Sequence, residues 1–145
     1  MLLTNFKNLI SGILSNRDCN VVDVAGNTKT LTPSEIVGAD GLLSNGYLSI
    51  GGNDENINKD MYRFINYGDN SFTSSNQGTN ISDDRIVYTG SYTNNTTSDL
   101  VVTNTGVSVH NNGWTKNFFI EISKLENPVT IKPNETKTFT IPINF

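Results

Sequence analysis

Apolar and polar residues alternate along the last third of the chain, residues 98–145, in three runs separated by turn-prone residues. Successive side chains of a strand point to opposite faces of a sheet, so alternation is typical of strands with one buried face. We therefore expect strands at 100–109, 117–125 and 135–145. The same pattern predicts strands at 85–92 and 47–50.

Apolar residues at the N-terminus recur instead at steps of three and four, which predicts a helix over 1–16 with Thr4 as its N-cap. The apolar face must pack against the chain's own sheet or against another subunit. Under the second interpretation it is a docking surface, as terminal helices often are in assemblies. The docking residues would be Leu3, Phe6, Ile10 and Ile13.

The segment between the helix and the last third contains shorter signals. Residues 20–31 predict a hairpin that turns at 25–27, and Thr32-Pro33-Ser34-Glu35 predicts a helix start with Glu35 placed for a capping box. Residues 68–84 are almost entirely polar, so we expect a long loop there.

These elements predict a mainly β protein with antiparallel strands. We expect an N-terminal amphipathic helix over 1–16 and a single β-sandwich over 17–145, with jelly-roll-like or Ig-like packing. Residues 84–145 are its most regular part, because the alternation is clearest there.

Composition agrees with a turn-rich β protein, since only 17% of residues are charged and uncharged polar residues must cover the surface. A net charge of −4 argues against binding to nucleic acid, which needs clustered Lys and Arg. Cys19 is the single cysteine, so an intrachain disulfide is excluded. The apolar N-terminal stretch is too short for a bilayer and lacks signal-peptide features, so we expect synthesis in the cytoplasm and no membrane contact.

Candidate catalytic groups are sparse. His110 is the only imidazole, and nucleophilic catalysis needs a base with an orienting acid. Asp83 and Asp84 are adjacent on a strand entry, where two carboxylates point in different directions and usually solvate a turn. We expect neither an enzyme nor a cofactor site.

One segment imitates a calcium loop. Asp54, Asn56, Asn58 and Asp60 have the spacing of the odd-numbered ligands. Counting from Asp54, however, the sixth residue is not glycine and the twelfth is not glutamate, and the motif needs both. We expect a solvated loop and no metal site.

A sharper binding hypothesis concerns Trp114, exposed on a polar hairpin tip, with Tyr88 and Tyr92 elsewhere on strands. Flat aromatic rings with a polar handle suit both sugars and protein interfaces. Trp114 would then stack on a host glycan. The alternative is a tryptophan that packs beneath its own loop.

The C-terminal block also resembles a known kind of protein. The run 100–109, an Asn-Gly tip, the run 118–122 and the segment PVTIKPNETKTFTIPINF at 128–145 resemble the C-terminal β domain of small tailed-bacteriophage virion proteins. Asn134 stands where that pattern usually has glycine, and both residues tolerate a left-handed backbone. Val107-Ser108-Val109 replaces the Gly-Leu-Tyr-like centre, and the front half has a similar layout up to Asp60-Met-Tyr62.

The resemblance implies a non-enzymatic structural or accessory protein of a phage particle, on the tail, collar or capsid surface. Its partners would be other virion proteins and copies of itself, through the N-terminal helix or through sheet edges. The alternative function is a carbohydrate-binding or receptor-binding module, with Trp114 and the 68–84 loop at its site.

Overall fold

The structure, a computed structural model, describes residues 1–37, 42–52, 57–61, 71–111 and 115–144. All paired strands are antiparallel. In chain order the elements are α1 (Thr4–Ser15), β1 (Cys19–Val22), β2 (Thr28–Leu31), α2 (Pro33–Val37), the 3₁₀ helix η1 (Leu42–Ser44), β3 (Gly46–Gly51), β4 (Phe72–Ile81), β5 (Arg85–Asn94), β6 (Leu100–His110), β7 (Asn117–Ile131) and β8 (Thr136–Asn144).

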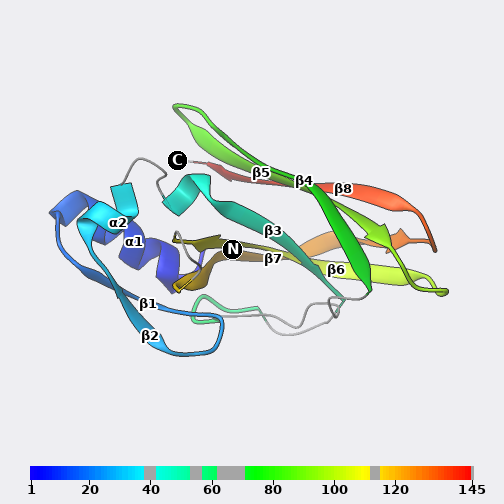
Figure 1. Cartoon of the computed structure of the whole chain (residues 1–145), viewed down its shortest axis with the longest axis horizontal. Coiled ribbons are helices and arrows are strands. Elements are labelled where there is room, and N and C mark those ends of the chain that lie inside the picture. The colour runs from blue at the N-terminus through cyan, green and yellow to red at the C-terminus, as the bar shows by residue number, and fades with distance from the viewer. Residues whose placement is uncertain (38–41, 53–56, 62–70, 112–114, 145) are drawn as a thin grey trace.

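Two three-stranded sheets face each other, one ordered β3-β6-β7 and the other β4-β5-β8. Figure 1 shows the β4-β5-β8 sheet along the top, the other sheet beneath it, and both α-helices at one end. The main core lies between the sheets, where Leu48, Val107 and Ile120 of one meet Tyr88 and Ile141 of the other. The predicted antiparallel sandwich with an N-terminal helix is confirmed.

The chain passes between the sheets repeatedly. The β4–β5 hairpin belongs to one sheet and the β6–β7 hairpin to the other, and β8 returns to pair with β5. The three strands predicted in the last third are therefore divided between both sheets. β7 also extends to Ile131, beyond the predicted end at 125. The prediction stopped early because the second half of β7 is largely exposed and its apolar pattern is less regular.

The predicted hairpin and helix start near the N-terminus are confirmed. Gly26 adopts a φ of 86° in the turn between β1 and β2, which glycine accommodates without strain. At the start of α2, the Glu35 carboxylate accepts a hydrogen bond of 2.8 Å from the Thr32 amide, as in a capping box. Asn134 has a φ of 61°, in the left-handed region that asparagine tolerates.

The prediction of a loop over 68–84 is wrong for most of that segment, because β4 occupies Phe72–Ile81. Among the described strands β4 pairs only with β5, at the edge of its sheet, and all but three of its residues are exposed. A strand that buries so little needs no alternating apolar residues, so the period-two signal was missing.

The expected N-cap is also wrong. α1 begins at Thr4, and its N-cap residue is Leu3, which makes no side-chain capping bond. The Thr4 amide donates instead to the carbonyl of Lys59, and the Thr4 hydroxyl donates to Asp60 at 2.8 Å. The helix start is therefore held by a distant segment of the chain. Among the helices that the structure describes, none has the length and apolarity to cross a membrane.

The face proposed as a docking surface packs against the chain's own core. Leu3 and Phe6 are only 2% and 8% exposed, and Ile10 and Ile13 are partly buried against the main core. The Asn5 amide adds polar contacts, with bonds to both backbone groups of Val22 and to the carbonyl of Phe119. Leu3 and Phe6 are therefore not available to a partner, and the intramolecular alternative applies to them.

Candidate functional site

Part of the outer face of the β3-β6-β7 sheet is apolar, and the chain covers that part. A second hydrophobic cluster, formed by Leu3, Phe119 and Ile122, lies apart from the main core. Val24, Ile57 and Met61 pack against it, so the helix start, the β1–β2 hairpin and the segment 57–61 all contribute. An isolated bridge between Leu2 and Glu121 adds backbone pairing at the free edge of β7.

The outer face of the β4-β5-β8 sheet has a different character. Tyr88, Tyr92, Phe139 and Ile141 point into the main core, so the alternate residues of β5 and β8 point outward. Most of those outward residues carry hydroxyl groups. We call this surface the hydroxyl face: Thr73 and Ser75 of β4, Thr89, Ser91 and Thr93 of β5, and Thr136, Thr138 and Thr140 of β8.

Strand register arranges these residues in transverse rows. Thr73, Thr93 and Thr136 are neighbours in one row, and Ser75, Ser91 and Thr138 in the next. Two hydroxyl pairs bond within the rows, Thr93 to Thr136 at 2.7 Å and Ser91 to Thr138 at 2.8 Å. The third row is Gly78, Thr89 and Thr140. The space above Gly78 is open, because a side chain placed there would have no atom within 4 Å of its Cβ.

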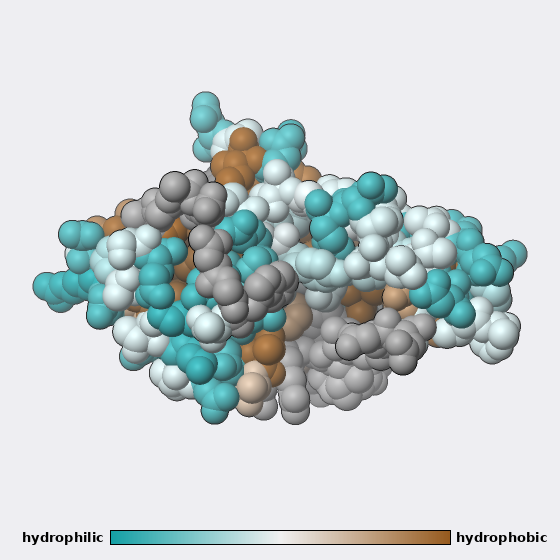
Figure 2. All heavy atoms as spheres, viewed as in Figure 1, coloured by the Kyte–Doolittle hydropathy of each residue, from teal (hydrophilic) through white to brown (hydrophobic). Residues whose placement is uncertain are grey.

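Charged side chains are confined to the ends of this sheet. Arg85 is the first residue of β5, and Lys137, near the start of β8, belongs to the alternate set and pairs with Glu135 at 2.9 Å. The three rows therefore contain no charged side chain. Figure 2 shows the side of the sandwich that faces the viewer in Figure 1, where brown hydrophobic atoms lie in separate areas among pale and teal ones.

A polar seam joins the two sheets at their β3 and β4 edges. A bulge in β4 between Ser75 and Gly78 contains Gln77 and also Asn76, which has a φ of 50°. The Gln77 amide accepts a bond of 3.1 Å from the Leu48 amide and donates to the Leu48 carbonyl and the Tyr92 hydroxyl. Burial raises the pKa of Tyr92, so its hydroxyl stays protonated and also donates to the Leu48 carbonyl.

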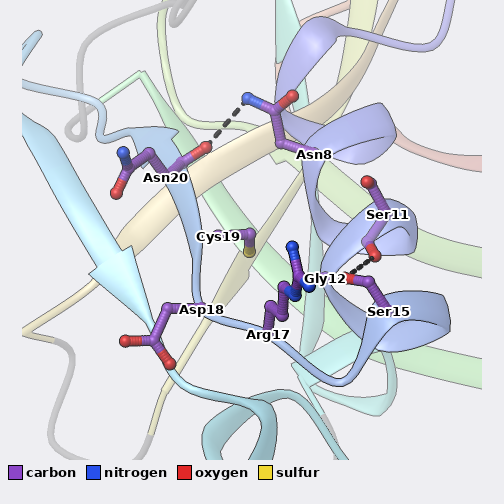
Figure 3. A pocket seen from close by; sticks show the side chains of 8 residues that line it. All are labelled: Asn8, Ser11, Gly12, Ser15, Arg17, Asp18, Cys19 and Asn20. Carbon is purple, nitrogen blue, oxygen red and sulfur yellow. Dashed lines mark hydrogen bonds between the residues drawn. The ribbon is translucent and has the colours of Figure 1, made fainter.

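A shallow polar pocket of about 470 Å³ lies where α1 meets β1. Figure 3 shows Asn8 donating to the carbonyl of Asn20 at 2.9 Å, beside Arg17 and Cys19. Burial raises the pKa of the Cys19 thiol, which disfavours the reactive thiolate. The Asn8 bond links the helix to the hairpin, so we interpret the pocket as a packing feature.

The sequence-based site candidates are not brought together. Trp114 lies outside the described residues, and so do Asp54 and Asn56. Tyr88 and Tyr92 are buried, so they are unavailable for stacking on a sugar. Asn58 bonds to the amide of Asp60, which accepts from Thr4, so both side chains serve local structure.

Titratable groups form no metal site among the residues that the structure describes. The His110 ring nitrogen lies 3.1 Å from the carbonyl of Asn111. Glu35 instead contacts Lys116 at 2.6 Å, and this hydrogen bond lowers the pKa of its carboxyl group. That ion pair connects α2 to the segment before β7.

Sequence reasoning missed the hydroxyl face and Gln77. The repeated Thr-x-Thr pattern at 136–140 and the Thr-x-Ser-x-Thr pattern at 89–93 were visible, but only strand register places them side by side. Comparisons with protein-family models, curated proteins and solved structures give no match to the chain. The case for function therefore depends on the geometry and on the sequence resemblance.

Proposed function

We propose that the chain is a non-enzymatic structural or accessory protein of a phage particle, a tail, collar or capsid-surface component. The hydroxyl face is the observation that carries this proposal. It is an open sheet face, whereas small-molecule sites are concave. A broad face of this kind suits contact with another protein.

Its lack of charge supports the same interpretation. Removing a charged group from water costs free energy unless it is paired, and the buried centres of protein interfaces are accordingly depleted of charge. The rows of the hydroxyl face meet that condition, while charged groups lie at the ends of the sheet. The resemblance of residues 100–145 to virion β domains supplies the class of assembly.

Mass spectrometry of purified particles from the source of this gene tests the proposal. We expect the chain at a constant ratio to the major particle protein through successive density gradients. Cryo-electron microscopy of those particles should then show a β-sandwich with one sheet face against a neighbouring subunit. Absence of the chain from washed particles would overturn the virion role.

A further inference from the structure

We propose that the hydroxyl face binds the same face of a second copy of this chain, related by a two-fold axis. This inference rests on the proposed structural role and names the partner. In such a contact, one surface patch must be complementary to itself. The rows of Thr and Ser side chains meet this requirement in hydrogen bonding and in charge.

Hydroxyl groups are complementary to one another. Each donates one hydrogen bond and accepts up to two, whereas lysine only donates and a carboxylate only accepts. A row of hydroxyls can thus face an identical row with donors and acceptors matched. The Thr93–Thr136 and Ser91–Thr138 pairs already use this property within one chain. Thr136 and Thr138 are exposed, whereas Ser91 is only 4% exposed.

Charge favours the hydroxyl face over other surfaces as the place where a second copy binds. The chain has a formal net charge of −4, so two copies repel each other over most approaches. The three rows carry no charged side chain that would be buried or opposed in the contact. The apolar part of the outer face of the other sheet is already covered by residues from the chain's own first half.

Thr89 is the best position for a test. It lies on the central strand, so its two copies come close to each other near a two-fold axis through the face. Its row neighbour Gly78 has open space above it, which leaves room for a longer side chain. Within the part of the chain that the structure describes, the Thr89 side chain makes no hydrogen bond that its replacement would remove.

The experiment is sedimentation velocity over a range of concentrations with wild type, Thr89→Lys, Thr89→Glu and an equimolar mixture of the two variants. We expect a wild-type dimer, and at least about 10-fold weaker association for each variant alone, because like charges then meet across the axis. The mixture should associate again, because lysine then meets glutamate. Thermal unfolding of each variant checks that it is folded.

Matched controls are Thr130→Lys and Thr130→Glu, at an exposed threonine of β7 in the other sheet. They should leave the association constant unchanged. A wild type that is monomeric at all concentrations would overturn the proposal, as would equal weakening by the Thr130 variants or a mixture that stays monomeric. If the chain is found in purified particles but is monomeric, the self-association proposal is contradicted and the virion role is not. If it forms a dimer but is absent from particles, the virion role is contradicted and self-association is not.

Discussion

The two sheets bury their inner faces in one core but differ on their outer faces. On the outer face of β3-β6-β7, residues from the first half of the chain cover the apolar side chains of Phe119 and Ile122. The outer face of β4-β5-β8 carries hydroxyl groups in rows, and Thr136, Thr138 and Thr140 are exposed there. An apolar face requires a cover because its exposure to water costs free energy, whereas a hydroxyl face does not. This contrast gives the N-terminal helix and hairpin a structural purpose.

The covered face should show the largest mutational effect. Ile122 is fully buried, so Ile122→Ala loses apolar contacts and leaves a cavity, with an expected cost of about 2–5 kcal/mol in the free energy of unfolding. Thr140→Ala, on the bare face, is the matched control and should stay within about 0.5 kcal/mol. Urea unfolding followed by circular dichroism measures both. Equal losses of unfolding free energy in Ile122→Ala and Thr140→Ala would contradict the contrast between a covered apolar face and a bare hydroxyl face.

A smaller effect is expected at the seam between the sheets. Gln77→Ala removes the bonds to the backbone of Leu48 and to Tyr92, and we expect a cost of about 1–3 kcal/mol because partly buried polar groups lose partners. Ser75→Ala, on the same strand but exposed and outward, is the control. Thermal unfolding compares the two. If Gln77→Ala costs no more than Ser75→Ala, the amide does not join the sheets.

The smallest effect concerns a charged group at one end of the hydroxyl face. The pKa of the half-exposed Glu135 carboxyl is lowered, first by a hydrogen bond from the Lys132 amide and then by a hydrogen bond from the Lys137 side chain. A lowered folded-state pKa adds stability above the unfolded pKa, and this stability is lost as pH falls through the folded value. We expect Glu135→Gln to be slightly less stable than wild type at neutral pH, with the difference vanishing in acid.

Thermal unfolding from neutral to acidic pH measures this difference. Glu126→Gln, at an exposed glutamate of β7, is the control and should follow the wild-type curve more closely. Parallel curves for wild type and Glu135→Gln at every pH would show that the turn before β8 gains nothing from ionisation of Glu135.

Much of the fold was predictable because it depends on local pattern. Alternation located β3, β5, β6 and β8, and helical periodicity located α1. β4 escaped prediction because an exposed edge strand needs no apolar alternation. The Thr4 cap was wrong because a segment more than fifty residues away satisfies that helix start.

The candidate site was less predictable than the fold. Threonines at 89, 93, 136 and 140 were visible as strand residues, yet their alignment in rows depends on the pairing of β5 with β8. Gln77 gave no signal, because a bulge directs its amide toward a strand of the other sheet. Pairings between segments far apart in the chain create both features.

By itself the sequence determined the secondary structure of most segments, since side-chain alternation and turn residues act over a few positions. Only the tertiary structure decided which strands share a sheet and which outer face is covered. Those choices depend on non-local pairing and burial, which a linear pattern does not record. The apolar face of α1 shows the difference, because the sequence required it to be buried and the structure placed it against the chain's own core.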